Sequence, residues 1–234
     1  MGIVVANVPA YCTVDVAEHA VLLLLAAWRK LPTAQAVARS GDWGLEPLRP
    51  LRRLRGATVG LVGFGRIARE TAARLAPFGV ELLAHDPAGD PGEAGRLGVR
   101  LCSLDALLAA SSAISIHVPL TPATRGLIDA RALDLMPRGA VVVNVGRGGV
   151  VDEDALLDAL ERGRVGAAAL DVLAAEPPAP DHPLLAHERV IVTPHMAYYT
   201  EDSLRDLRTT VARNAALVLT GREPLWRVEP PEVA

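Results

Sequence analysis

The sequence predicts an α/β fold built on a doubly wound parallel sheet with helices on both faces. Apolar runs of strand length alternate with helical patterns from residue 58 to residue 220, and this alternation is typical of parallel sheets covered by helices. A glycine turn joins the first of these runs to the first of these helical patterns. Polar residues follow directly after several predicted strands, at the edge where ligands bind in such sheets.

Composition and charge exclude several classes of protein. The 234 residues are 50% hydrophobic and 22% charged, which is an ordinary globular balance. A net charge of −3 provides no positive field to attract nucleic acid. The most apolar run, residues 20–28, is too short to cross a bilayer, so we expect no membrane association. Two cysteines suggest no disulfide framework and fit a cytoplasmic protein.

The glycine turn has the pattern and the setting of a dinucleotide-binding site. It comprises Gly63, Phe64, Gly65, Arg66, Ile67 and Ala68. The first glycine suits a tight turn, the second allows close approach to a pyrophosphate, and a small third residue lets helix pack on strand. The following helix directs its N–H groups at the phosphates. Taken alone, the turn could join any strand to any helix, but its flanking elements favour a Rossmann-type domain.

Asp86 supports this interpretation of the turn. It follows the second predicted strand, roughly 20 residues after the turn, where an acidic side chain accepts hydrogen bonds from an adenosine ribose. Its negative charge would also repel the 2′-phosphate of NADP. The adjoining residues 87–89 contain no arginine to receive such a phosphate. We therefore expect NAD as the cofactor.

The first 55 residues predict a strand, a long helix and a connector. Residues 2–5 resemble a short buried strand, and residues 15–18 resemble a capping box for a helix that continues to about Arg39. Residues 22–27 are apolar nearly all round, which suggests cover by another domain or subunit, or burial within the same core. The connector 40–55 contains Arg49, Arg52, Arg53 and Arg55; this basic cluster is either a phosphate site or a solvated surface.

The remaining elements follow in regular order. Strands are expected at 58–62, 80–85, 99–101, 113–118, 139–145, 165–172 and 189–193. Helices are expected at 66–77, 103–110, 129–135, 152–162 and 200–220, with Gly221 in the position that ends the last helix. Residues 86–98, which are rich in proline and glycine, are expected to form a loop.

Three polar residues after the later strands have complementary chemistry. Arg147 can bind a carboxylate through two parallel hydrogen bonds and polarise a nearby carbonyl. His195 can transfer a proton near neutral pH, and Glu176 can orient the imidazole ring. This set suits the reduction of a 2-keto acid, with hydride delivered from a nicotinamide to C2. Each residue alone could instead be structural. The other histidines, His19, His85, His182 and His187, show no metal-ligand spacing and are expected to be structural or solvated.

Several segments carry a resemblance to the D-isomer-specific 2-hydroxyacid dehydrogenases. They are residues 7–9, 17–19, 142–152, 169–172, 176–177 and 193–195. The resemblance implies Arg147 as the substrate-binding arginine, Glu176 as partner of the histidine and His195 as acid and base. It also implies that Asp171 meets the nicotinamide carboxamide. The complete set expected around NAD is Gly63, Phe64, Gly65, Arg66, Ile67, Ala68, Asp86, His117, Val118, Pro119, Leu120, Val145, Gly146, Asp171 and Tyr198.

Residues 195–201 resemble the C-terminal-binding-protein branch of this family. That branch includes NAD(H)-binding transcriptional corepressors, and it usually has tryptophan where this chain has Tyr198. Because the tryptophan lines the substrate pocket in that branch, the substrate preference is left open. A non-catalytic NAD(H)-binding interaction module is therefore the alternative to an enzyme that acts on a small 2-keto or 2-hydroxy acid.

The resemblance also predicts the domain organisation. Residues 1–222 are expected to form the NAD-binding domain and residues 223–234 a C-terminal tail. The family's N-terminal substrate domain, on the order of 100 residues, is expected to be largely absent. Residues 13–39 are expected to form a homodimer interface, as this helix does in the family. We expect the chain to bind NAD(H) and to reduce 2-keto acids poorly.

Overall fold

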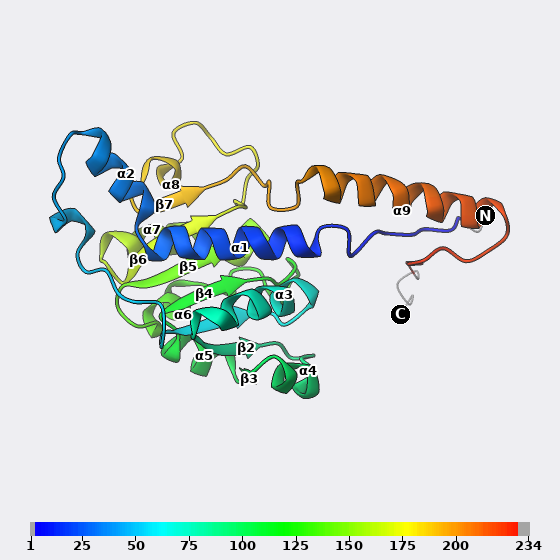
Figure 1. The fold of residues 1–234 in the computed structure, drawn as a ribbon, viewed down its shortest axis with the longest axis horizontal. Coiled ribbons are helices and arrows are strands. Elements are labelled where there is room, and N and C mark those ends of the chain that lie inside the picture. The colour runs from blue at the N-terminus through cyan, green and yellow to red at the C-terminus, as the bar shows by residue number, and fades with distance from the viewer. Residues whose placement is uncertain (1–2, 229–234) are drawn as a thin grey trace.

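The computed structural model describes residues 3–228, and within them a single parallel sheet forms the centre of the molecule (Figure 1). The strand order is β3-β2-β1-β4-β5-β6-β7, and every neighbouring pair is parallel. The bounds are β1 Thr58–Val62, β2 Glu81–His85, β3 Val99–Leu101, β4 Ala113–Ile116, β5 Ala140–Asn144, β6 Val165–Leu170 and β7 Val190–Val192. The order reverses beside β1, so the predicted doubly wound sheet is confirmed.

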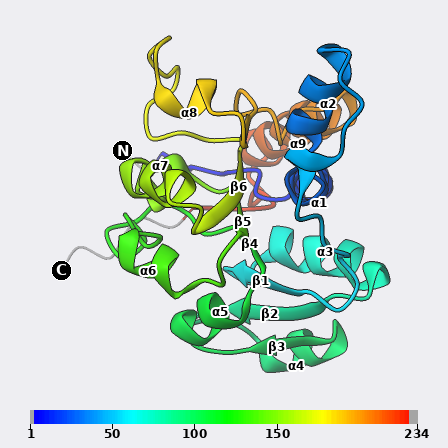
Figure 2. The ribbon, with the colours of Figure 1, turned by 90° about the vertical axis from the view of Figure 1, so that its left-hand side faces the viewer.

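Helices cover both faces of the sheet (Figure 2). One face carries α1 Thr13–Trp28 and α3 Arg66–Leu75; the other carries α5 Leu104–Ala110, α6 Ala130–Leu135 and α7 Glu153–Glu161. Further helices are α2 Leu31–Arg39, α4 Pro91–Arg96, α8 Pro183–Ala186 and α9 Glu201–Leu219, with short 3-10 turns η1 Glu46–Leu48, η2 Ala76–Phe78 and η3 Gly148–Val150. From residue 58 onwards, the predicted strands and helices begin and end within about two residues of these bounds.

The central strands are apolar on both sides because they separate two cores. Along β5, Val142 packs into the core beneath α5, α6 and α7, whereas Val141 and Val143 pack into the core beneath α1 and α3. Successive side chains of a strand point to opposite faces, so a strand buried on both faces needs a continuous apolar sequence. This is why the strands are continuous apolar runs and not alternating patterns.

The predicted strand at residues 2–5 is wrong for the part that the structure describes. Gly2 lies outside the described residues, and residues 3–5 are not in a strand. Ile3 is 82% exposed. The first β contact is an isolated antiparallel bridge between Ala6 and Arg227. A short apolar run forms a buried strand only where a sheet edge is available, and here the segment runs beside α9, away from the sheet.

The predicted long helix to Arg39 is also wrong, because two helices occupy this region. Helix α1 ends at Trp28, Lys30 has a left-handed backbone with φ of 50°, and α2 begins at Leu31. Pro32 lies in the first turn of α2; within a continuous helix, its ring would clash with the preceding turn and it would lack a donor.

The predicted capping box at residues 15–18 is absent. Helix α1 begins at Thr13, and its N-cap residue, Cys12, makes no side-chain capping bond. The Asp15 carboxylate instead accepts a hydrogen bond from the Thr200 hydroxyl. It therefore connects the start of α1 to the start of α9.

Helix α1 buries most of its apolar surface within the same molecule. One side of it, which includes Val16, Ala20, Leu23, Leu24 and Ala27, packs into the core with α3 and the sheet. This arrangement supports the alternative of an internal core helix for that side. On its outer side, Leu22 is 58% exposed.

The connector that follows α2 supports the solvated interpretation of its basic cluster. The four arginines of that cluster are all exposed, and Arg49 pairs with Glu46. The expected loop at residues 86–98 contains α4, which is a correction to the prediction. Asp90 caps this helix by accepting from the N–H groups of Gly92 and Glu93, so Asp90 and Pro91 act as a local helix-start signal.

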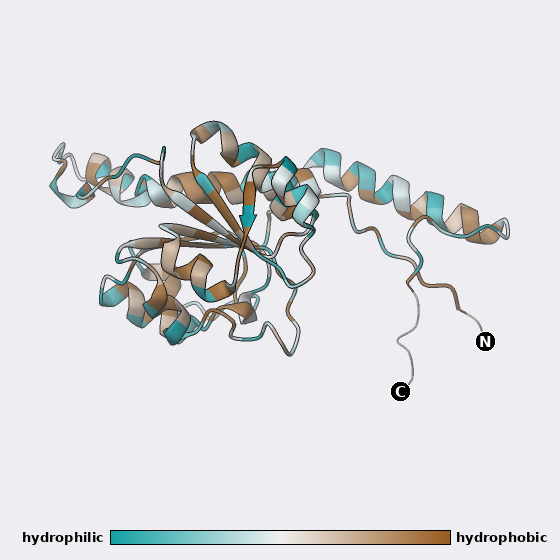
Figure 3. Ribbon diagram, turned by 90° about the horizontal axis from the view of Figure 1, so that it is seen from below, coloured by the Kyte–Doolittle hydropathy of each residue, from teal (hydrophilic) through white to brown (hydrophobic). Residues whose placement is uncertain are grey.

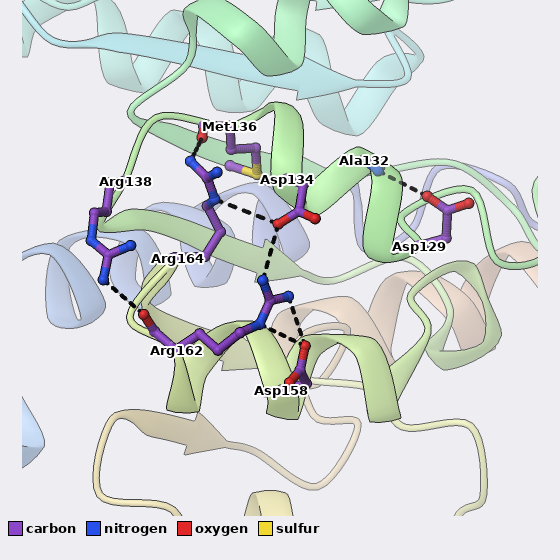
Figure 4. Close-up of polar contacts among 8 residues, drawn as sticks. All are labelled: Asp129, Ala132, Asp134, Met136, Arg138, Asp158, Arg162 and Arg164. Carbon is purple, nitrogen blue, oxygen red and sulfur yellow. Dashed lines mark hydrogen bonds and ion pairs between the residues drawn. The ribbon is translucent and has the colours of Figure 1, made fainter.

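A network of charged side chains ties α6 to α7 near the amino end of β6, away from the predicted site (Figure 4). The Arg162 guanidinium contacts the carboxylates of Asp158 and Asp134. Arg164 pairs with the same Asp134 and donates to the Met136 carbonyl. These pairs are largely exposed, so they contribute little individually, but together they fix the helix ends on this side of the sheet.

Helix α9 extends away from the body of the molecule, with two terminal segments beside it (Figures 1 and 3). Backbone bonds join Asn7 to Trp226 and Val228 to Val5. Asn214 of α9, which is buried, bonds to both segments through the Asn7 carbonyl and the Leu225 N–H. Among residues 3–228, no helix is long and apolar enough to cross a membrane.

Candidate active site

The glycine turn after β1 adopts the conformation that a dinucleotide site needs. Gly63 has φ of +93°, and a Cβ there would lie 2.9 Å from Val118 Cγ1, so only glycine fits. Gly65 has an ordinary φ of −74°, yet no atom of residues 3–228 outside its own neighbours lies within 4 Å of the Cβ it would carry. Helix α3 begins there without a side-chain cap. Open space above uncapped N–H groups fits a pyrophosphate.

Asp86 lies beside this turn, as predicted, and it also supports the turn directly. Its Oδ2 accepts from the Phe64 N–H at 2.8 Å, and its Oδ1 accepts from the Ala88 N–H at 2.9 Å. Each carboxylate oxygen can accept a second bond. The half-buried Asp86 therefore fits a ribose diol while holding the backbone that would contact the pyrophosphate.

The loop after β4 packs against both the glycine turn and the loop after β5. The Val118 side chain lies under Gly63, and its carbonyl oxygen would lie 2.8 Å from a Cβ on Gly146. Leu120 is 37% exposed. The ring nitrogens of His117 are buried with no hydrogen-bond partner among the described residues. Burial lowers the His117 pKa to about 3, so this ring is neutral at physiological pH.

Arg147 follows β5 on a rigidly held backbone. The buried Asn144 side chain donates to the Arg147 carbonyl at 3.0 Å and accepts from the Gly146 N–H at 3.0 Å. A Cβ on Gly148 would lie 1.9 Å from the Leu173 carbonyl carbon. The backbone of the loop after β5 is therefore in direct contact with the backbone of the loop after β6. Arg147 is an exposed residue; its Nη1 donates to the Gly146 carbonyl at 2.7 Å, and the guanidinium has further N–H groups that a ligand could accept from.

Glu176 and His195 form a hydrogen-bonded pair. His195 Nδ1 lies 2.6 Å from Glu176 Oε2, and Glu176 Oε1 accepts from the Leu173 N–H at 3.0 Å. His195 has φ of 52°, a left-handed backbone that is uncommon for a residue with a side chain and that often occurs at functional sites. The Glu176 side chain is 36% exposed and the His195 side chain 41% exposed, so a ligand can reach the pair.

Asp171 organises the turn that carries His195. Its carboxylate is 1% exposed and accepts bonds from the Thr193 hydroxyl and from the N–H groups of Met196 and Ala197. Burial alone would raise the pKa of Asp171, but hydrogen bonds from His19, Thr193 and the two N–H groups outweigh it, so the pKa is below its usual value. Asp171 is therefore an anion held by fixed donors.

The structure also brings Tyr11 to this edge of the sheet, which the sequence did not indicate. Burial raises the pKa of Tyr11 to about 12; the neighbouring Cys12 and Tyr198 add to this rise, and Arg147 opposes it. The Tyr198 ring itself lies 6.2 Å, centroid to centroid, from the His195 ring. The chain has only three tyrosines, and this low number is the sequence feature that could have drawn attention to Tyr11.

A cavity of about 420 Å³ adjoins the Glu176–His195 pair. Its walls come from the loops after β6 and β7 and from α8. They are formed by Asp171, Leu173, Glu176, Pro177, Pro178, Leu185, Val192, Thr193, Pro194 and His195. The cavity combines apolar walls with three titratable groups, as small-molecule sites usually do.

Comparison with known proteins agrees with this geometry. Residues 21–197 match the family described as D-isomer specific 2-hydroxyacid dehydrogenase, NAD binding domain. D-3-phosphoglycerate dehydrogenase of Archaeoglobus fulgidus is 42% identical over 94% of this chain and 42% of its own length. The enzyme of that name from Mycobacterium bovis is 44% identical over 94% of this chain and 41% of its own length.

Solved structures give the same result. The crystal structure of D-lactate dehydrogenase with NAD+ from Lactobacillus jensenii superposes with a TM-score of 0.91 at 30% identity, over 97% of this chain and 72% of that one. The chain spans less than half the length of the two D-3-phosphoglycerate dehydrogenases named above. The predictions of the family and of an NAD-binding domain are confirmed. The chain belongs to the D-isomer-specific 2-hydroxyacid dehydrogenases, of which it carries the NAD-binding domain.

Proposed function

We propose that the protein is an NAD-dependent oxidoreductase that interconverts a small 2-hydroxy acid and the corresponding 2-keto acid. The observation that carries this proposal is the 2.6 Å contact between His195 and Glu176, at the same sheet edge as the accessible Arg147. The named relatives are dehydrogenases of D-3-phosphoglycerate and D-lactate, which are 2-hydroxy acids.

Each of the three residues has a distinct role in this proposal. The Arg147 guanidinium binds the substrate carboxylate through two parallel hydrogen bonds. His195 donates a proton to the carbonyl oxygen during reduction and accepts it during oxidation. Glu176 holds the ring through Nδ1, so that Nε2 is directed at the substrate. When bound, NAD supplies the hydride chemistry.

The cofactor would lie along the carboxyl edge, over the loops that the sequence identified. The turn at residues 63–68 would hold the pyrophosphate and Asp86 the adenosine ribose. The loops 117–120 and 145–146 would line the nicotinamide side. Asp171 would accept from the carboxamide, and Tyr198 would lie at the substrate end. The open space at Gly65 and the remaining acceptor positions on Asp86 support this assignment.

We also propose that residues 1–222 form the NAD-binding domain, with 223–234 as a tail, and that a substrate domain outside this chain completes the site. The end of α9 that lies farthest from the sheet supports the proposal of a separate substrate domain. An apolar cavity of about 340 Å³ there is lined by Val4, Ala6, Asn214, Ala215, Val218 and Leu219. Without that domain, water would reach Arg147 and His195 from one side and weaken substrate binding.

NADH binding and turnover, measured on the same preparation, test the proposed function. We expect calorimetry to show NADH binding, and we expect slow NADH oxidation with a panel of 2-keto acids. His195→Ala should reduce this oxidation by about 10²–10⁴-fold, limited by the assay background, and leave NADH affinity nearly unchanged. His187 lies outside the site, where its ring nitrogen accepts from the Arg189 N–H. His187→Ala is therefore the control and should oxidise NADH at the wild-type rate.

The same experiment separates the competing function. If the chain binds NADH and no 2-keto acid is reduced above background, a non-catalytic interaction module, as in the corepressor branch, is the better account. Equal turnover in His195→Ala and the unmodified chain would overturn the assigned role of His195. Fast turnover would show that the pocket is complete without another domain, which contradicts the proposed domain organisation.

We further propose a homodimer that pairs through residues 13–39, and a cytoplasmic location. The outer side of this region supports the dimer, because it exposes Val14, Leu22 and Leu31 by 47%, 58% and 55% respectively. The two cysteines, Cys12 and Cys102, are free thiols, and free thiols persist in a reducing compartment.

A further inference from the structure

His19 lies on α1, distant in sequence from the loops of the candidate site, yet its ring contacts two of their residues. Its Nε2 is 3.1 Å from Thr193 Oγ1 and 3.4 Å from Asp171 Oδ1. The His19 side chain is only 11% exposed. The sequence predicted a structural or solvated histidine, and nothing in the spacing of residues connected His19 to Asp171.

The hydrogen bonds determine which atom donates in this cluster. The Thr193 hydroxyl has a single proton, and it donates that proton to Asp171 Oδ1 at 2.6 Å. In its contact with His19, Thr193 Oγ1 must therefore accept, so His19 Nε2 must carry a proton. That N–H is shared between the hydroxyl oxygen of Thr193 and the carboxylate of Asp171.

The Asp171 carboxylate consequently has one saturated oxygen and one open oxygen. Oδ1 receives the Thr193 hydroxyl and the Met196 N–H, with the His19 N–H beside them. Within the described part of the chain, Oδ2 receives only the Ala197 N–H, at 2.9 Å. A carboxylate oxygen accepts about two hydrogen bonds, so Oδ2 retains one acceptor position and Oδ1 retains none.

We propose that His19 is a positioning residue for the nicotinamide end of the cofactor site. Its Nε2–H holds Thr193 and Oδ1 of Asp171 in place, so that Oδ2 is presented to the NH2 group of the carboxamide. The inference rests on the proposed function, because it assumes that Asp171 meets the carboxamide. It assigns to α1 a part in cofactor recognition in addition to its part in the core.

The test compares two ligands that differ in the nicotinamide ring. NADH carries the carboxamide, whereas ADP-ribose keeps the adenosine and pyrophosphate but lacks the ring. Calorimetric titration of His19→Leu should show NADH binding weakened about tenfold, the loss expected for one charge-assisted hydrogen bond. ADP-ribose binding should be unchanged. His19→Gln can place an amide N–H near the position of Nε2 and should bind NADH within about threefold of the unmodified chain.

Thr193→Val provides a second, independent variant. It removes the hydroxyl that both His19 and Asp171 contact, so it should also weaken NADH selectively. Because the two residues act through one network, the double variant His19→Leu/Thr193→Val should lose no more than the larger single effect. His182 is a histidine that pairs with Glu153. His182→Leu is the matched control and should leave the affinities for NADH and ADP-ribose unchanged.

The outcomes are distinguishable. Equal weakening of NADH and ADP-ribose in His19→Leu, or no change in either, would show that His19 does not position the carboxamide site, and the inference would be overturned. Failure of His19→Gln to recover NADH binding would also overturn it. If the unmodified chain binds neither ligand, the proposed function itself fails, and this inference fails with it.

Discussion

At the scale of single residues, each of the two carboxylates of the site holds backbone in addition to the ligand contact that we propose for it. Asp86 bonds to the glycine turn through Phe64, and Asp171 bonds to the turn that carries His195. Both keep acceptor capacity for a ligand. In the proposed function, the geometry of the loops and their affinity for a cofactor therefore depend on the same side chains.

Replacing Asp86 should reduce the preference for NAD over NADP. In Asp86→Ala, we expect NADH affinity to fall about 10- to 100-fold, because bonds to a charged acceptor contribute about 1.5–3 kcal/mol. NADPH affinity should fall less, because the carboxylate no longer repels the 2′-phosphate. Fluorescence titration with both cofactors measures the ratio. Asp90→Ala, which removes only the α4 cap, should not change this ratio. Equal affinities for NADH and NADPH in the unmodified chain would contradict the expectation of NAD.

At the scale of elements, the junction between β1 and α3 contains one glycine that the fold requires and one that only the proposed cofactor would require. Gly63 is constrained by its positive φ and by Val118, whereas Gly65 is constrained by nothing within 4 Å. The fold alone therefore permits a side chain at Gly65. The proposed pyrophosphate position would occupy this space.

Gly65→Ala should consequently affect binding without affecting stability. We expect the free energy of unfolding to change by less than about 0.5 kcal/mol, while NADH affinity falls about tenfold or more because the methyl group occupies the pyrophosphate position. The matched variant Gly63→Ala should lower the free energy of unfolding by about 1–3 kcal/mol. Urea unfolding and calorimetry measure the two quantities. Unchanged NADH binding in Gly65→Ala would show that the phosphates lie elsewhere.

At the scale of the whole molecule, two regions expose more apolar surface than the compact body. One is the outward end of α9 with the terminal segments, and the other is the outer side of α1 and α2 with the connector that follows them. Trp43 on that connector is 85% exposed. Apolar surface of this kind usually marks contacts between domains or subunits.

The dimer proposal predicts that substitutions on α1 and α2 change the mass in solution. Sizing chromatography with light scattering should give a dimer at micromolar concentration. Leu22→Glu together with Leu31→Glu should weaken association about 30-fold or more, since buried apolar anchors contribute about 2 kcal/mol or more. Val211→Glu on α9, where the original side chain is 52% exposed, should remain dimeric. A monomer at all micromolar concentrations would contradict the proposed interface.

Local sequence patterns by themselves determined much of this protein. The order of strands and helices from residue 58, the glycine turn and the position of Asp86 depend on neighbouring residues, through backbone conformation and hydrophobic periodicity. The candidate residues Arg147 and His195 were found because each directly follows a predicted strand, and parallel strands end at one edge. The end of α1 before Pro32 was also specified locally, by the proline, although the apolar run of α1 led to the prediction of one long helix.

Only the tertiary structure decided which distant side chains meet. Residues 3–5 are as apolar as a buried strand, yet they lie beside α9 and far from both edges of the sheet (Figure 1). The side of α1 that is buried depends on where α3 and the sheet lie. His19 meets Asp171 and Thr193 only because the first half of α1 lies beside the residues that follow β6 and β7. Contacts between residues more than a hundred positions apart depend on the packing of whole elements, and no local pattern in the sequence specifies them.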